Sequence, residues 1–189
     1  MHIIQEQGVG ALTLRGVADR LGVSRTALYR HFSSKQALLG AVAGEGFRTL
    51  RAELVAAYEA GARGRHGFEE MGLAYVRFAI RHPSHYRVMF GGFVTRDDID
   101  PDPSTVGGDA FQVLVDAITE QQGAGLVTAD DPRLLAVYIW SVVHGVAMLA
   151  LDGMLKPPVD AEALMGFANL RLRTGMELGP RRPPGESQD

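Results

Sequence analysis

The segment TLRGVADRLGVSRTALYRHFSSK, residues 13–35, predicts two short helices separated by a tight turn. The first helix has an apolar face, at helical spacing, made of Leu14, Val17, Ala18 and Leu21. The turn falls at Gly22, and Ser24 follows it as the cap of the second helix. Leu28 and Phe32 give that second helix an inward face. The segment therefore predicts a compact pair of helices, with the other side of the second helix left exposed.

The exposed side of this second helix combines small, aromatic and basic residues. They are Arg25, Thr26, Ala27, Tyr29, Arg30 and His31. A short helix with small residues near its N-terminus, followed by aromatic and basic ones, suits insertion into the major groove of DNA. The small side chains let the helix approach the bases, where a thymine methyl group is within reach. The helix pair thus predicts contact with DNA.

The charge of the chain is split unevenly along its length. The whole chain carries a net charge of −3 at pH 7. Residues 1–50 hold six basic and three acidic residues, whereas residues 51–189 hold 13 basic and 19 acidic ones. The helix pair therefore lies in the positively charged part of the chain, as a surface that meets DNA phosphates requires.

Composition bounds what the rest of the chain can be. The 189 residues suffice for one large domain, or for a small and a larger one, and 46% of them are hydrophobic. There is no cysteine, which excludes disulfides, thiolate chemistry and cysteine zinc sites. No basic segment precedes a long apolar run, so we expect no signal peptide. The most apolar stretch, residues 134–151, includes His144 and Gly145 and is better explained as a buried helix than as a membrane span. We expect a cytoplasmic protein.

Helical spacing predicts an all-α fold of about nine helices, because no segment alternates with the period of a strand. Besides the helix pair, the predicted helices cover residues 1–7, 35–60, 68–81, 84–90, 109–122, 132–152 and 160–178. Residues 61–67 and 93–108 are predicted loops. Three glycines inside the long fourth helix, Gly40, Gly44 and Gly46, either bend it or allow close packing. The sequence leaves both interpretations open.

The N-terminal segment closely resembles the DNA-binding domain of TetR-family (tetracycline-repressor-like) transcriptional regulators. The matching residues are Ala11-x-Thr13-x-Arg15-x-Val17-Ala18, Leu21-Gly22-Val23-Ser24 and Leu28-Tyr29-x-His31-Phe32-x-Ser34-Lys35-x-x-Leu38-Leu39. A weaker resemblance concerns the ligand-binding domain of the branch named for its Trp-His-Gly signature. It rests on Tyr86-Arg87-x-Met89-Phe90 and Trp140-Ser141-x-x-His144-Gly145.

The resemblance implies three regions: a DNA-binding domain at residues 1–45, an effector-binding and dimerisation domain at residues 46–178, and a disordered tail at residues 179–189. Family members usually carry a longer first helix than the seven residues that precede Gly8 here. The first helix is therefore short for the family, and a truncated helix would brace the DNA-binding domain less firmly.

The resemblance and the local chemistry point to the same candidate DNA contacts. We expect these to be Thr13, Arg15, Ser24, Arg25, Thr26, Ala27, Tyr29, Arg30, His31 and Lys35. Thr13 and the backbone N–H groups beside it can hold a phosphate at a helix N-terminus. The resemblance implies that Tyr29 and His31 bind phosphate and that Lys35 adds a further phosphate contact. For Arg15 and Arg30, a solvated surface is an equally good interpretation.

The C-terminal part offers a candidate effector pocket and a candidate dimer interface. The large apolar and semi-polar residues expected at the pocket are Tyr75, Phe78, Tyr86, Met89, Phe90, Phe111, Trp140, His144 and Met148. A place in the ordinary core is an equally good interpretation for each of them. The family resemblance implies that the last two helices pair with their twofold mates, through Val137, Val142, Leu149, Leu164, Phe167, Leu170 and Met176.

Two weaker patterns suggest metal sites, and we expect neither to bind metal. Pro83 separates His82 from His85, and no third ligand is evident. Asp98, Asp100, Asp102 and Asp109 have the spacing of a calcium loop, but Pro103 stands where that loop needs glycine. A solvated acidic loop explains them.

We therefore expect a one-component transcriptional regulator that binds double-stranded DNA as a homodimer. It is best explained as a repressor released from a palindromic operator by a small, largely apolar effector. Two alternatives remain open: a ligand-binding protein of the same fold with weak or lost DNA binding, and an activator without an effector. No G-x-S-x-G, P-loop or dinucleotide motif is present, so we expect neither an enzyme nor a cofactor.

Overall fold

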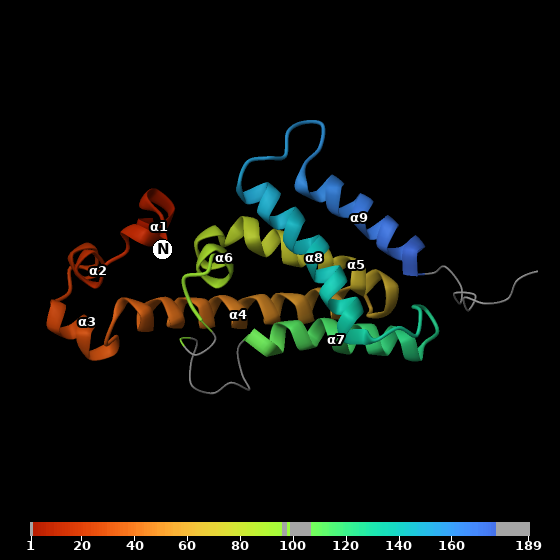
Figure 1. Cartoon of the computed structure of the whole chain (residues 1–189), viewed down its shortest axis with the longest axis horizontal. Helices are drawn as coiled ribbons and strands as arrows, with labels where there is room; N and C mark the ends of the chain where they lie inside the picture. The colour runs from red at the N-terminus through yellow and green to blue at the C-terminus, as the bar shows by residue number, and fades with distance from the viewer. Residues whose placement is uncertain (1, 96–97, 99–106, 177–189) are drawn as a thin grey trace, which may run out of the picture.

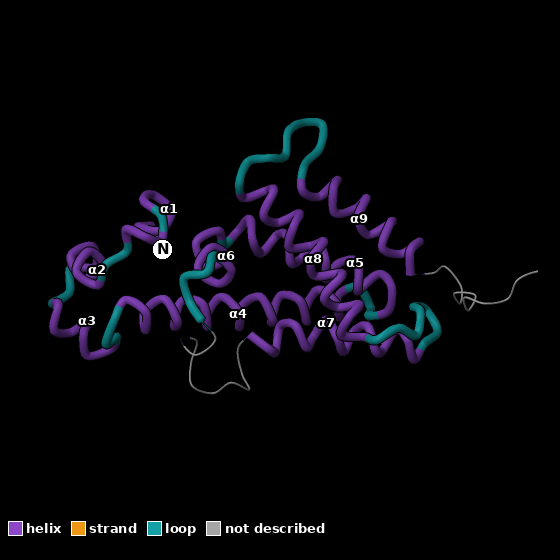
Figure 2. The backbone as a smooth tube through the Cα atoms, viewed as in Figure 1, coloured by secondary structure: helices purple, strands orange, loops and turns teal. Residues whose placement is uncertain are grey.

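A computed structural model describes residues 2–95, 98 and 107–176, with side chains except at 107–109 and 176. The elements are α1 (His2–Gln7), the 3₁₀ turn η1 (Val9–Ala11), α2 (Leu14–Leu21), α3 (Arg25–His31), α4 (Lys35–Ala60), α5 (Gly64–Arg81), α6 (Pro83–Phe90), α7 (Gly107–Gly123), α8 (Pro132–Leu151) and α9 (Ala161–Met176). Within the described residues all regular structure is helical, as Figure 2 shows, which confirms the predicted all-α class. The predicted tail, residues 179–189, lies outside the described part.

The long helix α4 connects the two parts of the molecule (Figure 1). Its 26 residues extend over about 39 Å. At its N-terminal end lie α2 and α3, which we call the helix-turn-helix unit. The rest of α4 packs against α5, α6 and α7, and α8 and α9 pack on the other side of α5. We call α5–α9 the body. The predicted boundary at residues 45 and 46 falls inside this continuous helix.

Local signals position the helix-turn-helix unit. Gly22 ends α2 in the left-handed conformation, with φ of 67°, and Val23 N–H returns to the carbonyl of Ala18. The core of the unit is a separate cluster of Leu14, Ala18 and Leu28, with Val17, Phe32 and Leu38 packed against it. The two predicted apolar faces therefore meet, with one exception.

That exception is Leu21, which was predicted on the inward face of the first helix. Its side chain is 65% exposed. Leu21 is the last residue of α2. The chain turns away at Gly22 immediately after it, and no neighbouring helix covers that end. The prediction for Leu21 was wrong because helical spacing alone does not say where a covering partner stops.

The helix α1 belongs to the main core rather than to the core of the helix-turn-helix unit. Ile4, Val9 and Leu12 are at most 5% exposed and join the cluster that Leu39 and Ala43 of α4 line. The Glu6 carboxylate also accepts two hydrogen bonds from the Arg20 guanidinium, at 2.8 and 2.9 Å. The short first helix therefore links α2 to α4 and α6.

Two of the three glycines of α4 allow close packing, which supports one of the two interpretations left open above. A Cβ at Gly46 would lie 2.4 Å from the Met89 sulfur, and a Cβ at Gly40 would lie 1.8 Å from the backbone oxygen of Asp98. Side chains at these positions would push α6 and the segment after it away from α4. The two glycines thus let α6 and the segment after it pack closely against α4.

The turn between α4 and α5 is shorter than predicted. Residues 61–67 were expected to form a loop, but α5 begins at Gly64. Three successive residues, Ala62, Arg63 and Gly64, have φ between 56° and 58° and reverse the chain at once. Gly67 of α5 then packs on α4, where its Cβ would lie 2.4 Å from the Tyr58 carbonyl oxygen. The loop prediction was wrong because it counted glycines as loop residues without considering this close approach.

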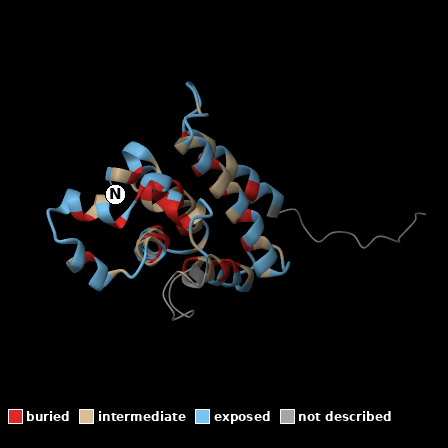
Figure 3. Cartoon of the chain, turned by 60° about the vertical axis from the view of Figure 1, so that its left-hand side comes forward, coloured by how far each residue is buried: buried red, intermediate tan, exposed pale blue. Residues whose placement is uncertain are grey.

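The helix α8 is apolar along its whole length but only partly buried. By length and composition alone it could cross a membrane, and 28% of the most apolar window is buried within the chain. Its buried side includes Ile139, Val143 and Ala147, which pack against the body. Figure 3 shows many buried residues in the middle of the molecule, and mostly exposed residues on the helix-turn-helix unit near the N-terminus. The other side of α8 is therefore an uncovered apolar surface.

Candidate DNA interface and ligand cavity

The free side of α3 exposes most of the residues predicted to contact DNA. The Tyr29 ring is 53% exposed, and the exposed residues beside it are Arg25, Thr26, Arg30 and His31. Ala27 is half-buried, and Leu28 faces the core of the unit. The structure thus brings the predicted small, aromatic and basic side chains together on one accessible surface.

Two further candidates act as helix caps. The Thr13 hydroxyl accepts a hydrogen bond from the Gly16 N–H at 3.0 Å, and the Ser24 hydroxyl accepts one from the Ala27 N–H at 3.1 Å. The caps fix the N-terminal ends of α2 and α3. These ends carry partial positive charge from the helix dipole, which favours a nearby phosphate.

The arginines on this surface are held only loosely. Arg15 and Arg25 approach the same carboxylate, Asp19, at 3.8 and 3.9 Å. Their side chains are 70% and 54% exposed. Exposed ion pairs of this length contribute little to stability. Both guanidinium groups are therefore available to exchange Asp19 for a phosphate.

Lys35, the first residue of α4, makes a contact that the sequence did not suggest. Its Nζ donates to the carbonyl oxygen of Gly10 at 2.8 Å. An ammonium group has three N–H donors, so two remain for a phosphate. Lys35 thus connects η1 to the beginning of α4 beside the predicted DNA surface.

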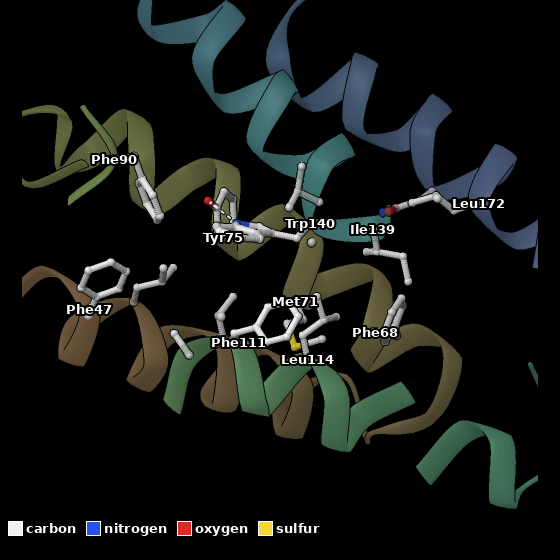
Figure 4. Close-up of a pocket in the computed structure, with 16 residues that line it drawn as sticks. Phe47, Phe68, Met71, Tyr75, Phe90, Phe111, Leu114, Ile139, Trp140 and Leu172 are labelled. Atoms are coloured by element: carbon white, nitrogen blue, oxygen red, sulfur yellow. Dashed lines mark hydrogen bonds between the residues drawn. The ribbon is translucent and has the colours of Figure 1, made fainter. Parts of the chain in front are cut away.

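The body contains an apolar cavity of about 290 Å³. Its walls come from α4, α5, α6, α7, α8 and α9 (Figure 4). The lining residues are Phe47, Leu50, Leu54, Phe68, Met71, Gly72, Tyr75, Phe90, Ala110, Phe111, Leu114, Ile139, Trp140, Val143, Asn169 and Leu172. A mostly hydrophobic cavity with few polar groups is the usual form of a site for a small apolar molecule.

Four of the nine predicted pocket residues line this cavity: Tyr75, Phe90, Phe111 and Trp140. Phe90 packs edge-on against Phe47 of α4, with ring centroids 5.5 Å apart. Phe111 packs in the same way against Trp140, at 5.8 Å. These aromatic pairs connect α4, α6, α7 and α8 around the empty volume.

Tyr86 and His144 lie next to the cavity wall and complete a hydrogen-bonded cluster with Tyr75 and Trp140. Trp140 Nε1–H donates to the Tyr75 oxygen at 2.9 Å. The two tyrosine oxygens are 3.1 Å apart, and the Tyr86 oxygen is 2.7 Å from His144 Nδ1. With His144 neutral and its proton on Nε2, Tyr86 O–H donates to Nδ1 and Tyr75 O–H donates to Tyr86. Every donor that links the four side chains then has an acceptor within the cluster.

Burial shapes the acid–base properties of this cluster. Loss of hydration raises the pKa of Tyr75 to about 12 and also raises the pKa of Tyr86. The same cause lowers the pKa of His144. All three side chains therefore stay neutral around pH 7. The cluster presents no net charge to the cavity.

The remaining predicted pocket residues lie elsewhere. Phe78 is fully buried in the main core and does not line the cavity. Met89 packs at the contact between α6 and α4, beside Gly46. Met148 is 38% exposed and lines a shallow recess near α6 instead. Trp140, His144 and Met148 were expected to share a face of α8, but only the first of them reaches the cavity.

Several lining residues were not predicted. Phe47, Leu50 and Leu54 lie along α4, and their helical spacing did not single them out as pocket residues. Gly72 leaves space beside Asn169, whose Oδ1 would lie 3.4 Å from a Cβ there. Among them only Asn169 could have been recognised from the sequence, because it is a polar residue within an apolar stretch of α9.

The uncovered sides of α8 and α9 hold most of the residues predicted at a dimer interface. The exposed fractions are 51% for Val137, 42% for Leu149, 56% for Phe167 and 44% for Leu170. Val142 and Leu164 are half-buried, and the side chain of Met176 lies outside the described part. Further exposed apolar residues on α8 are Leu134 and Tyr138. A large apolar surface of this kind favours a partner.

Neither metal pattern gains support from the described residues. Among them, no three His, Asp or Glu side chains lie close enough together to hold a metal ion. Asp98 accepts hydrogen bonds from Thr95 and Gln36, and these lower the pKa of its carboxyl. The side chains of Asp100, Asp102 and Asp109 fall outside the described part.

Comparison with known families matches both parts of the chain. The model of bacterial regulatory proteins of the tetR family matches residues 1–42, and that of the tetracyclin repressor-like C-terminal domain matches residues 68–172. The chain belongs to the TetR family. This TetR-family protein is therefore a DNA-binding transcriptional regulator.

Individual relatives agree with this. An uncharacterized HTH-type transcriptional regulator of Mycobacterium tuberculosis, Rv0681, is 28% identical over 184 residues, which cover 94% of this chain and 78% of that protein. The class A tetracycline repressor from transposon 1721 of Escherichia coli is 51% identical, but only over 43 residues, or 23% of this chain and 20% of that one. A solved structure of a Rhodococcus sp. RHA1 protein of unknown function superimposes with a TM-score of 0.79 at 30% identity, covering 93% and 90% of the two chains.

Proposed function

We propose that this TetR-family regulator is a homodimeric repressor that leaves a palindromic operator when a small, largely apolar effector enters the cavity. One observation carries the proposal. The helix that begins beside the recognition helix α3 is the same unbroken helix whose Phe47, Leu50 and Leu54 line the cavity. A ligand that displaces these side chains acts directly on the element that carries the helix-turn-helix unit.

A second connection runs through α6 and supports the same coupling. Phe90, at the end of α6, lines the cavity. The segment after it returns to α4, where Gln36 Nε2 donates to the Phe93 carbonyl oxygen and to an Asp98 carboxylate oxygen, each at 2.8 Å. Gln36 lies one residue after Lys35 in the first turn of α4. Movement of α6 would therefore reach α4 next to the DNA surface.

The uncovered apolar surface of α8 and α9 supports a dimer. A twofold dimer through this surface would present two copies of α3, and such pairs bind half-sites about 34 Å apart on one face of DNA. The operator would then be a palindrome. Because the DNA of the cell is its partner, we place the protein in the cytoplasm.

The dimer is tested with Phe167→Glu, which puts a charge on the proposed interface. We expect light scattering to show a monomer and the protein to lose sequence-specific binding. Ile80→Glu is the matched control, because Ile80 is a 47% exposed apolar residue that belongs to α5 and not to α8 or α9. It should remain a dimer. If the Phe167→Glu protein stays dimeric and binds normally, the interface is wrongly placed.

The regulatory step is tested on an operator selected from random DNA with the purified protein. Decan-1-ol, a probe with an apolar chain, is titrated into the complex while anisotropy reports DNA binding and Trp140 fluorescence reports occupancy of the cavity. The chain has one tryptophan, so the fluorescence signal comes from the cavity wall. We expect DNA to be released as the cavity fills, because an effector acts through its different affinity for the two states. Saturation of the fluorescence change with unaltered operator affinity would contradict the coupling.

A further inference from the structure

The helix α7 carries a buried amide donor for which the described part of the chain provides no acceptor. Gln121 is 3% exposed, and its Nε2 has no hydrogen-bond partner. A buried donor left without an acceptor lowers stability, so proteins usually pair such groups. The unpaired donor is therefore the expected place for an acceptor that comes from outside the chain.

Gln121 lines a small recess that lies next to the apolar cavity. The recess has a volume of about 30 Å³, and Gln121 is part of its wall. It shares the lining residues Phe68, Asn169 and Leu172 with the cavity, so the two spaces are neighbours that have these three side chains between them. A volume of this size accommodates about one water molecule or one small polar group. The recess is large enough for the head of a ligand but not for its body.

Basic side chains lie in the wall of the recess. Arg173 lines it, together with Arg65 and the carboxylate of Glu69. A carboxylate head beside Arg173 would bring the acceptor that Gln121 lacks together with a charge opposite to that of the guanidinium group.

The far end of the cavity cannot provide the same anchor. There the Trp140 N–H and the Tyr75 hydroxyl are already bonded to each other and to the cluster behind them. A ligand oxygen placed at that end would have to break these bonds. The head of the ligand is therefore directed to the Gln121 end.

We propose that the effector is a carboxylate with an apolar tail. The tail fills the 290 Å³ cavity, which corresponds to about ten water volumes, and one carboxylate oxygen accepts a hydrogen bond from Gln121 Nε2 beside Arg173. The inference rests on the proposed function, since it requires that the cavity binds a ligand. It adds the chemical class of that ligand and the residue that selects it.

The experiment compares decanoate, decan-1-ol and decylamine, which share a tail and differ in the head. Binding is followed through Trp140 fluorescence and confirmed by calorimetry. We expect the wild type to bind decanoate about tenfold more tightly than decan-1-ol, as one hydrogen bond to a charged group allows. Decylamine should bind most weakly. In Gln121→Leu the preference should vanish, while affinity for decan-1-ol changes less than about twofold.

Gln122 provides a matched control on the same helix. Its Nε2 donates to the carbonyl oxygens of Thr128 and Asp130, each at 2.8 Å, so its hydrogen bonds are satisfied. Gln122→Leu should lower the thermal midpoint and keep the preference for decanoate. Gln121→Leu should raise the midpoint, because it removes an unpaired donor, and lose the preference. Arg173→Met, which leaves the core intact, should also weaken decanoate selectively.

The possible failures are distinguishable. Equal binding of decanoate and decan-1-ol by the wild type overturns the carboxylate inference and leaves the cavity's role standing. The same conclusion follows if the Gln121→Leu protein keeps its preference for decanoate. It also follows if that protein loses affinity for decanoate and decan-1-ol to the same extent. If neither compound binds, the proposed role of the cavity falls together with the inference.

Discussion

The helix-turn-helix unit closes on three buried side chains, Leu14, Ala18 and Leu28, whereas the core that includes the body joins residues from α1 and η1 and from α4 to α9. The small unit owes its form to local features, such as helix caps and one left-handed glycine. The body owes its form to contacts between residues far apart in the chain, and these contacts leave a cavity. The small unit exposes the side chains that are predicted to contact DNA, whereas the side chains of the body surround an empty space.

The largest expected effect is the loss of stability in Phe78→Ala, which removes a large side chain from the main core. Phe78 has no exposed surface, and truncating such a residue costs about 3–5 kcal/mol of unfolding free energy. Leu28→Ala removes a central residue of the small unit instead. We expect Phe78→Ala to lower the urea midpoint reported by Trp140 strongly. Leu28→Ala should abolish operator binding and shift that midpoint only slightly. Equal shifts would show that the unit and the body unfold together.

Close packing of α4 on α6 predicts the next effect. The Cβ of Gly46→Ala would meet the Met89 sulfur at 2.4 Å, and overpacking of this kind costs about 1–3 kcal/mol. Gly123→Ala at the exposed end of α7 is the control, since a Cβ there meets nothing within 4 Å. Chemical denaturation should show a clear loss for the first variant and none for the second. An unchanged Gly46→Ala protein would mean that Met89 moves aside without cost.

On the DNA surface, Lys35→Met should weaken operator binding and lower the salt dependence of binding by about one unit, because one phosphate contact is lost. Lys35→Arg should restore both. Arg48→Met also removes a positive charge from α4, at an exposed position further along the helix, and should leave the salt slope unchanged. If both methionine variants lower the salt dependence of binding equally, Lys35 acts through the overall electrostatic field of the protein and not through a phosphate contact of its own. If Lys35→Met keeps the slope, its bond to Gly10 is its main role.

The two regions also differ in how much the sequence could reveal. The caps at Thr13 and Ser24 and the turn at Gly22 are local, so residues a few positions apart predicted them. Leu21 was misplaced because its exposure depends on where neighbouring helices end. The same reason limits prediction of the cavity: Leu50 and Phe78 are both apolar residues at helical spacing, and only the assembled helices determine that one faces the empty volume.

Polar groups inside the body were harder still. A buried tryptophan or tyrosine needs a hydrogen-bond partner, but which residues satisfy Trp140 and Tyr75 depends on helices that are distant in sequence. The sequence could not single out Gln121, because its neighbour Gln122 is also a glutamine. In the structure the Nε2 of Gln122 donates two hydrogen bonds, whereas the Nε2 of Gln121 has no partner. Burial and bonding separate the two amides, and composition does not.

The smallest effect concerns the pH dependence of the body. Burial lowers the pKa of His144, so around and below the ordinary value of 6.5 the unfolded chain binds more protons than the folded one. Stability from the neutral His144 is therefore complete above that value and is lost as the pH falls. Protonation also reverses the hydrogen bond between Tyr86 and His144, so one of the two tyrosine O–H groups is left without an acceptor in the cluster.

Denaturation at pH 7.5 and pH 5.5 should accordingly show a loss of stability that is smaller in His144→Gln, whose side-chain oxygen can still accept from Tyr86. His85 shifts in the same direction, chiefly through burial, with Glu45 opposing, so part of the loss should persist in the variant. The helix-turn-helix unit contains no buried histidine, and Leu28→Ala should not alter the pH dependence. An identical pH dependence in wild type and His144→Gln would show that the hydrogen-bonded cluster adjusts to the extra proton without loss.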